Sequence, residues 1–269
     1  MISLFKSKPK LVDIIPSNYV DIHSHLLPGI DDGAKTTDDS RNILKSMIRF
    51  GFNEVITTPH TIKTVWDNSR EDILNTYQNV TKDLNFETSK TQLRVASENM
   101  MDENFVQLFK SEPLLTLKEN YVLVEMSYLN PPIQLLDILF ELQLEGYKPV
   151  LAHPERYTFY HNKLNEYEKL KKAGCLFQMN LLSSVGYYGK DVAKAVDKLL
   201  TNNMIDYVGS DIHHQHHIAA FENKLIIKTK KKSKLNSFMK PNKVVTKVIL
   251  SQTNEENLHQ HNRRDVYYR

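Results

Sequence analysis

Nitrogen- and oxygen-bearing side chains recur along the sequence at the ends of short apolar runs that are typical of β-strands. The runs are YVDIHSH, EVITTPH, LRVASE, YVLVE, PVLAH and DYVGSDIH. Their terminal side chains are His23, His25, His60, Glu98, Glu125, His153, Asp211 and His213, and Asp31 and Asp32 follow the first run. Imidazole nitrogens and carboxylate oxygens are ligands for Mn, Zn or Fe, so the set predicts a metal centre.

The spacing within two of these runs has a geometric meaning. Residues i and i+2 of a strand point to the same face, so His23 and His25 can both face one site. Asp211 and His213 share this spacing. Five histidines and about four carboxylates exceed the four or so ligands that one zinc-type ion takes. The set therefore indicates two or three ions that share bridging carboxylates.

Each residue taken alone has an ordinary structural interpretation. A single histidine at a strand end is commonly a hydrogen-bonded polar residue, and the Asp31–Asp32 pair alone is typical of a solvated turn. The metal hypothesis depends on their joint placement after six separate strands. The remaining histidines do not follow this pattern, and we expect them in loops or on the surface; they are His161, His214, His216 and His217.

The elements that must position these side chains alternate between strand and helix patterns. Strands are expected at Tyr19–His25, Glu54–Thr58, Leu93–Ser97, Val122–Met126, Val150–Ala152, Leu176–Met179 and Tyr207–Gly209. Helices are expected at Asp38–Phe50 (capped by Thr37 or Asp38), Ser69–Leu84, Asn104–Lys110, Pro132–Glu145, Leu164–Ala173 and Lys190–Thr201. Seven βα-type repeats predict a parallel sheet covered by helices, and closure of such units forms a barrel with its site at the carboxyl ends of the strands.

Composition excludes several other classes of protein. The net charge of +3 is too small to indicate nucleic acid as a partner. No apolar run approaches the roughly 18 residues of a membrane helix, and the basic N-terminus lacks the apolar region of a secretory signal. The single cysteine, Cys175, permits no intrachain disulfide. A cytoplasmic protein that is not integral to a membrane is expected.

Three segments are expected along the 269 residues. They are an N-terminal extension (1–18), a barrel (19–225) and a Lys/Asn-rich C-terminal tail (226–269) that we expect to be irregular or partly disordered.

The ordered motifs DIHSHLLPGIDDG, TTPH, SEN, VEMS, AHPER and GSDIH resemble the PHP phosphoesterases. Within that superfamily the chain is most similar to the tyrosine phosphatases found with bacterial capsule and exopolysaccharide loci, from about Tyr19 to His213. The resemblance implies a distorted (β/α)7, TIM-like barrel of the PHP type.

The resemblance also implies a site with three divalent ions, most often manganese, with Fe, Mg or Zn as alternatives. The first would take His23, His25 and Asp211 with Glu98 bridging, the second Glu98, Glu125 and His153, and the third Asp32, His60 and His213. Arg156 of AHPER matches the arginine that holds the phosphate.

The implied activity is hydrolysis of phosphotyrosine by metal-activated water, with the tyrosine-rich tail of a bacterial tyrosine kinase in capsule export as the substrate. The first alternative is histidinol phosphatase or another small-molecule phosphomonoesterase on the same fold. An amidohydrolase-like enzyme usually has a bridging lysine, and no lysine stands at a strand end here. A relict binding module and a nuclease domain are further alternatives. Cys175 lacks the C-x5-R phosphate loop of thiol phosphatases, so a thiol nucleophile is not expected.

Overall fold

Two sets of parallel strands form the centre of the protein in the computed structural model, which describes residues 8–228. One sheet has the order β1-β2-β4 and the other β3-β5-β6-β7-β8-β9, with every pair parallel. The strands are β1 (Tyr19–Asp21), β2 (Phe52–Thr57), β3 (His60–Thr61), β4 (Gln92–Val95), β5 (Glu98–Met100), β6 (Tyr121–Glu125), β7 (Lys148–Ala152), β8 (Leu176–Asn180) and β9 (Tyr207–Gly209). The predicted α/β class with parallel strands is confirmed.

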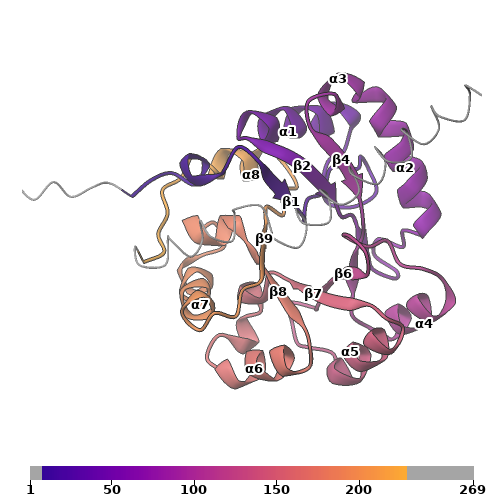
Figure 1. The fold of residues 1–269 in the computed structure, drawn as a ribbon, viewed down its shortest axis with the longest axis vertical. Coiled ribbons are helices and arrows are strands. Elements are labelled where there is room, and N and C mark those ends of the chain that lie inside the picture. The colour runs from indigo at the N-terminus through magenta and orange to yellow at the C-terminus, as the bar shows by residue number, and fades with distance from the viewer. Residues whose placement is uncertain (1–7, 229–269) are drawn as a thin grey trace, which may run out of the picture.

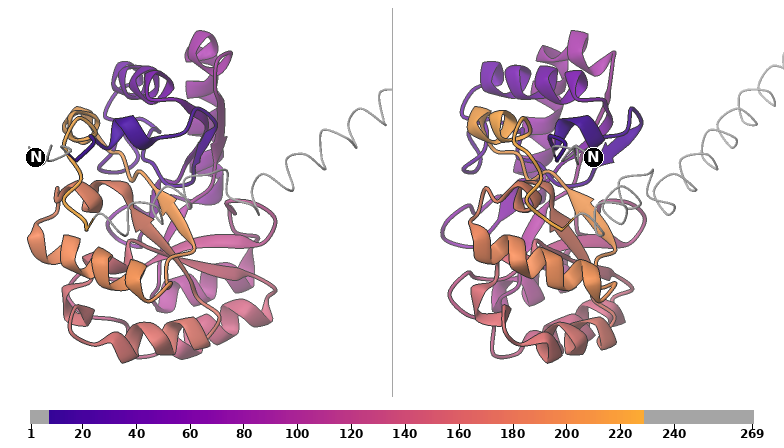
Figure 2. Two further views of the ribbon diagram at one scale, coloured as in Figure 1. Left: turned by 60° about the vertical axis from the view of Figure 1, so that its left-hand side comes forward. Right: turned by 90° about the vertical axis from the view of Figure 1, so that its left-hand side faces the viewer.

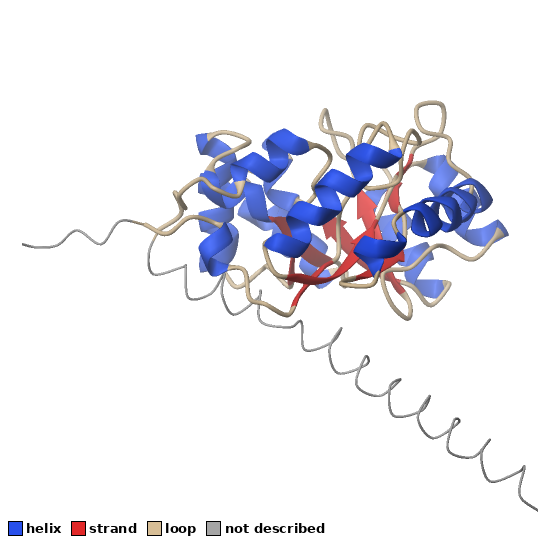
Figure 3. Cartoon of the chain, turned by 90° about the horizontal axis from the view of Figure 1, so that it is seen from above, coloured by secondary structure: helices blue, strands red, loops and turns tan. Residues whose placement is uncertain are grey.

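Helices lie outside the strands, as Figures 1 and 3 show. The α-helices are α1 (Thr37–Arg49), α2 (Arg70–Asp83), α3 (Asn85–Thr88), α4 (Glu103–Ser111), α5 (Leu135–Leu144), α6 (Leu164–Lys172), α7 (Lys190–Thr201) and α8 (Gln215–Ala220). Short 3-10 helices are η1 (Val12–Ile14), η2 (Pro154–Arg156), η3 (Thr158–Tyr160) and η4 (Leu181–Val185). No helix within residues 8–228 is both long and apolar enough to cross a bilayer.

The first helix begins one residue earlier than the sequence predicted. Its N-cap is Thr36, whose hydroxyl accepts a hydrogen bond from the Asp39 amide. The Asp39 carboxylate accepts the Thr36 amide in return, which completes a capping box. The predicted cap at Thr37 or Asp38 is therefore wrong, because the reciprocal pair requires the spacing between Thr36 and Asp39.

Two short strands, β3 and β5, were not predicted as separate elements. Pro59 has no amide hydrogen to donate, so the ladder that contains β2 is interrupted there and resumes at His60. In β3 and β5, His60 pairs in register with Glu98. This pairing brings two predicted ligands from distant parts of the chain to the same level of the sheet.

The two ends of the described chain meet beside α1. Helix α8 packs against α1, as Figure 2 shows, and the Leu11 amide donates to the carbonyl of Asn223. The N-terminal extension is described from residue 8. Of the predicted tail (226–269), residues 226–228 are described, with Ile227 buried in the core, and the rest lies outside the described residues.

The space between the strands is apolar at one end and polar at the other. A small buried cluster consists of Val20, Ile22, Ile56, Ala96, Leu117, Leu123, Val150, Ala152 and Tyr207. On β6, Leu123 belongs to this cluster, and Glu125, two residues later on the same face, belongs to the group of candidate ligands described next. The strands therefore carry their polar side chains at their carboxyl ends.

Candidate metal centre

The predicted ligand residues come together in three overlapping groups. Within each group the candidate ligand atoms lie within 4.8 Å of one another. The groups are His23, His25, Glu98 and Asp211; His60, Glu98 and Glu125; and His25, Asp32, His60 and His213. Eight of the nine predicted ligands thus belong to at least one group, and the ninth, His153, lies against Glu98.

The first group is fully buried. The Nε2 atom of His23 lies 3.1 Å from Oε2 of Glu98 and 3.2 Å from Oδ1 of Asp211. The Nε2 atom of His25 lies 3.4 Å from each of the same two oxygens. Two imidazoles and two carboxylates therefore face one point, as the first implied ligand set requires.

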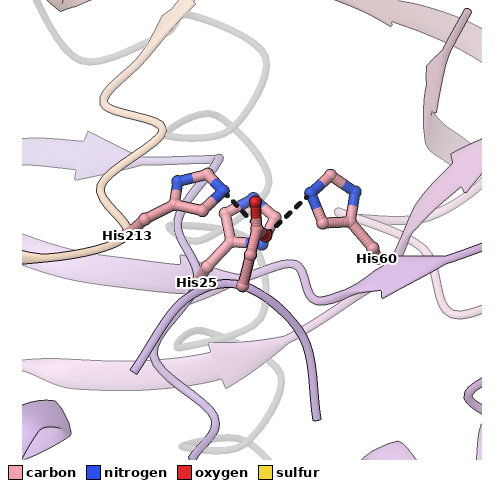
Figure 4. Close-up of side chains that lie close together, drawn as sticks. His25, His60 and His213 are labelled. Atoms are coloured by element: carbon pink, nitrogen blue, oxygen red, sulfur yellow. Dashed lines mark ion pairs between the residues drawn. The ribbon is translucent and has the colours of Figure 1, made fainter. Parts of the chain in front are cut away.

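The third group forms the open edge of the centre. Oδ1 of Asp32 lies 3.4 Å from Nε2 of His60 and 3.3 Å from Nε2 of His213. Figure 4 shows His25 between His60 and His213, with dashed lines that mark the two ion pairs of this carboxylate. The Asp32 side chain is 50% exposed, so solvent or a ligand can reach this edge.

The second group differs from the set that the resemblance implied. Nδ1 of His60, rather than His153, lies 2.8 Å from Oε1 of Glu125 and 3.3 Å from Oε2 of Glu98. Nε2 of His153 lies 3.2 Å from the other oxygen, Oε1, of Glu98. His60 therefore stands between the second and third groups, and Glu98 contacts imidazoles on both of its oxygens.

Several buried ligand atoms make no hydrogen bond of standard geometry, although some of them face each other, as Nδ1 of His60 faces Oε1 of Glu125 at 2.8 Å. Among the described residues these atoms include Nδ1 of His60, Oε1 of Glu98, Oε1 of Glu125 and Nδ1 of His153. Leaving a buried polar atom unpaired is costly, so such atoms are rare without a ligand or water. Orphaned nitrogen and oxygen atoms that converge in this way fit divalent cations, which these donors would coordinate.

Neighbouring residues fix which imidazole nitrogen faces the centre. Nδ1 of His23 donates to Oε1 of Gln178 at 2.8 Å, and Nδ1 of His25 donates to Oδ2 of Asp31 at 2.8 Å. Both Nε2 atoms are thereby left for coordination, which is the usual arrangement around metal-binding histidines. The sequence analysis noted Asp31 but assigned it no role, and it did not identify Gln178. The hydrogen bonds of both residues to the histidines depend on the tertiary structure.

The charges of the groups favour cation binding. Burial alone would lower the pKa of His60, but Glu98 and Glu125 raise it to about 10. Burial would raise the pKa of Glu98, yet His23 and His60 hold it well below its usual range. Burial lowers the pKa of His153 to about 4, with Arg156 adding to the effect, so this imidazole is neutral at pH 7. Ionised carboxylates surrounded by imidazoles bind protons or metal ions in competition.

The backbone is strained at two of these positions. His153 has φ of 36° and Asp211 has φ of 53°, both in the left-handed region that non-glycine residues avoid. Gly209 is needed nearby, because a Cβ there would lie 2.8 Å from Cβ of His23. Such strain is concentrated at functional sites, where the surrounding fold maintains it.

Arg156 lies beside the first group and reaches the pocket. Its Nη1 atom donates to Oδ2 of Asp211 at 2.8 Å, and Nδ2 of Asn180 donates to the same oxygen at 2.8 Å. The guanidinium lies 4.8 Å from the ring centre of Tyr128 and 4.2 Å from that of Tyr188. A cation held between two aromatic rings has few alternative positions.

A pocket of about 530 Å³ opens above the centre. Its polar lining includes Asp32, His60, Glu125, His153, Arg156, Asp211 and His213. Its apolar and aromatic lining includes Ile62, Trp66, Met100, Tyr128, Leu129 and Tyr188. Trp66 stacks on His60 and Tyr128 stacks on His153, so aromatic rings cover the imidazoles on the pocket side. The pocket can thus hold an anion at its base and an aromatic group higher up.

Two of the histidines outside the predicted set differ from the expectation of a loop. His216 and His217 belong to α8, and His217 lines the pocket, where its Nδ1 accepts from the His213 amide. In the sequence, the four-residue spacing between His213 and His217 could have indicated that His217 lies near the predicted ligand His213. His161 lies outside the pocket lining, and its Nε2 donates a hydrogen bond to the carbonyl of Glu155. Cys175 is buried in the apolar core, away from the pocket lining.

The chain is similar to a known protein family and to several of its members. A family described as "Capsular polysaccharide synthesis, CpsB/CapC" matches residues 19–239. The tyrosine-protein phosphatase YwqE of Bacillus subtilis is 30% identical over 195 residues, which cover 72% of this chain and 77% of that protein. The putative tyrosine-protein phosphatase CapC of Staphylococcus aureus is 26% identical, over 72% of this chain and 76% of that protein.

Solved structures agree with the sequence comparisons. A chain from the crystal structures of YwqE and of CpsB from Streptococcus pneumoniae, described as unique metal-dependent tyrosine phosphatases, has a TM-score of 0.69 at 28% identity. It aligns with 79% of this chain and 83% of its own length. Histidinol phosphate phosphatase from Lactococcus lactis has a TM-score of 0.52 at 13% identity, over 83% of this chain and 94% of its own, and shares the fold alone.

Proposed function

The chain belongs to the CpsB/CapC family of capsular polysaccharide synthesis, and from this premise we propose that it is a metal-dependent protein-tyrosine phosphatase. The observation that carries the proposal is the centre itself. Buried imidazole and carboxylate atoms that make no hydrogen bond of standard geometry converge beside an arginine, at the base of a pocket with aromatic walls.

We further propose that the centre holds three divalent ions, manganese first among Mn, Fe, Mg and Zn. The first ion would take His23, His25, Glu98 and Asp211, and the other two would share Glu98, Glu125, His153, Asp32, His60 and His213. When bound, such ions polarise phosphoryl oxygens and lower the pKa of water toward about 7. Glu98 is suited to a bridging role because both of its oxygens face imidazoles.

In this proposal the protein's own residues bind and orient the phosphate ester. The guanidinium of Arg156 binds phosphoryl oxygens as a planar fork, which lysine cannot reproduce. Asp211 accepts a hydrogen bond from the guanidinium at 2.8 Å, and the guanidinium carbon lies over the rings of Tyr128 and Tyr188. Phosphoryl transfer depends mainly on such positioning and on charge stabilisation.

The aromatic lining favours an aryl ester as the substrate. A phenyl ring could lie against Trp66 or Tyr128 while its phosphate reaches Arg156. The tyrosine leaving group has a pKa of about 10, so its departure depends less on an acid than that of an alkoxide. These features favour phosphotyrosine over histidinol phosphate.

The finer features of the family are proposed with the activity. Hydrogen-bonded pairing of Ser24 with Ile212, just after β1 and β9, supports a distorted (β/α)7 barrel of the PHP type. The proposed substrate is the tyrosine-rich tail of a bacterial tyrosine kinase in capsule or exopolysaccharide export, which would place the reaction in the cytoplasm.

A side-by-side assay tests the proposal. The purified full chain, supplied with Mn²⁺, should hydrolyse a phosphotyrosine peptide with a kcat/KM at least tenfold above that for histidinol phosphate. Equal or greater turnover of histidinol phosphate would assign the chain to the small-molecule phosphatases of this fold. No turnover of either substrate, with metal bound, would refute a phosphomonoesterase.

A further inference from the structure

The outer face of α5 carries a row of exposed apolar side chains. Leu136, Phe140 and Leu144 recur at every fourth residue and are each more than half exposed, so they form one stripe on the helix. Ile133 and Leu129, in the segment that precedes the helix, are also apolar and almost fully exposed. We call these five residues the α5 strip. Contiguous exposed apolar patches on soluble proteins commonly mark binding sites.

The strip begins at the mouth of the pocket. Leu129 lines the pocket next to Tyr128, in the loop that follows β6. From this loop α5 runs back toward the start of β7, along the outside of the molecule (Figure 1). The strip therefore leads directly from the substrate pocket onto the protein surface.

One edge of the strip is acidic. Asp137, Glu141 and Glu145 recur with the same four-residue spacing as the apolar residues, and Glu141 forms an ion pair with Lys110 of α4. Because the Glu141 carboxylate is paired with Lys110, Asp137 and Glu145 carry the net negative charge of this edge, which attracts lysine or arginine and repels anionic surfaces.

We propose that the α5 strip docks an apolar segment, accompanied by basic residues, of the protein that carries the phosphotyrosine. This inference rests on the proposed phosphatase activity and adds a second contact with the protein substrate, outside the pocket. A free phosphorylated metabolite that fits the pocket would make no use of a surface that extends down the helix.

The acidic row disfavours two other occupants. An anionic membrane surface would face the carboxylates of Asp137 and Glu145 at close range. A second copy of the chain, packed antiparallel through α5, would place the two acidic rows against each other. A peptide segment with basic and apolar residues is not repelled by the acidic row.

The length of the strip sets the size of the probe. Leu136 and Leu144 are separated by eight residues, or roughly 12 Å of helix, which an extended peptide covers in about four residues. Several more peptide residues are needed to pass Leu129 and Ile133. A peptide of about 14 residues can therefore extend from the pocket along the strip.

The test compares three substrates on three proteins. The substrates are p-nitrophenyl phosphate, a 14-residue phosphotyrosine peptide with leucine and lysine on both sides of the phosphotyrosine, and the same peptide with serine at those positions. The proteins are the full chain loaded with Mn²⁺, its L136Q/F140Q variant and the control I226Q. Ile226 is also partly exposed but packs beside Gly186, outside the strip.

The parent chain should prefer the leucine and lysine peptide over the serine peptide by about tenfold in kcat/KM, from apolar burial along the strip. L136Q/F140Q should lose this preference and keep its turnover of p-nitrophenyl phosphate, which also shows that it folds. I226Q should behave as the parent.

The inference would be overturned if the parent had equal kcat/KM for the two peptides, or if the preference survived in L136Q/F140Q. In either case, turnover of p-nitrophenyl phosphate would still support the proposed phosphatase activity. Light scattering that shows a dimeric parent and a monomeric L136Q/F140Q variant would overturn it in favour of a second copy. A parent that hydrolyses none of the three substrates would overturn both proposals.

Discussion

Exchange of Arg156 for alanine removes the one arginine or lysine side chain among the described residues that line the pocket beside the candidate metal centre. Its side chain is 21% exposed, and one amino group is occupied by Asp211. The remaining donors are available to a phosphate in the pocket. Two charge-assisted hydrogen bonds of about 1.5–3 kcal/mol each correspond to about 3–6 kcal/mol before compensation by water or metal.

Water entering the pocket will replace part of this interaction, so we expect the lower half of the range. A loss of about 3–4 kcal/mol in transition-state stabilisation lowers kcat/KM by about 10²–10³. Arg156→Lys keeps the charge but loses the fork, and its activity should lie between those of the parent and Arg156→Ala.

The metal content of both variants should stay close to that of the parent. Oδ2 of Asp211 keeps its hydrogen bond from Asn180, and Oδ1, which faces His23, is not touched by the exchange. The assay is kcat and KM on p-nitrophenyl phosphate and a phosphotyrosine peptide, with metal per chain measured on the same samples. A rate within threefold of the parent would refute the phosphate-binding role, and an equal loss of metal and rate would assign Arg156 a structural role instead.

Three further variants test other parts of the account. Glu98→Gln removes the carboxylate that contacts imidazoles on both oxygens, so bound metal should fall at least by half, and full occupancy in elemental analysis would contradict its bridging role. Tyr128→Ala should lower the ratio of kcat/KM for phosphotyrosine to that for phosphoserine about tenfold, through loss of aromatic burial; an unchanged ratio would exclude Tyr128 from the aryl subsite. Burial raises the pKa of the Cys175 thiol to about 12, so the folded protein should resist iodoacetamide up to about pH 10, and Cys175→Ala should retain full activity; rapid alkylation at pH 9 would show that the thiol is accessible.

Local spacing was enough to predict part of the centre. The strand β1 ends at Asp21 rather than at His25 as predicted, but His23 and His25 follow it two residues apart, and both Nε2 atoms face Glu98 and Asp211 as expected. Positions at strand ends predicted the others because parallel strands present their carboxyl ends to one edge. These inferences need no knowledge of which strand pairs with which.

The partners of each ligand could not be predicted, because they depend on register and on backbone interruptions. His60 lies beside Glu125 because Pro59 separates β2 from β3 and β3 then pairs with β5. The contact between Arg156 and Asp211 joins residues 55 positions apart. Gln178 is a β8 residue without any metal-binding pattern around it, and only the folded chain places it against His23.

The last helix was missed for a related reason. Only six residues long, α8 has too little sequence for a helical period, and four histidines surround its start. Helix α8 packs against α1, and its residues Ile218 and Ala220 are buried in the core. This packing stabilises a helix that is too short to be stable by local propensity. This packing brings His217 into the pocket.

The most direct test of the central claim is a titration of metal against activity on one sample. The protein is stripped with chelator, Mn²⁺ is returned stepwise, and ions per chain and phosphotyrosine turnover are measured at each step. The account predicts negligible turnover without metal and full recovery as two to three ions bind per chain. Undiminished phosphotyrosine turnover in protein that holds no metal would contradict it.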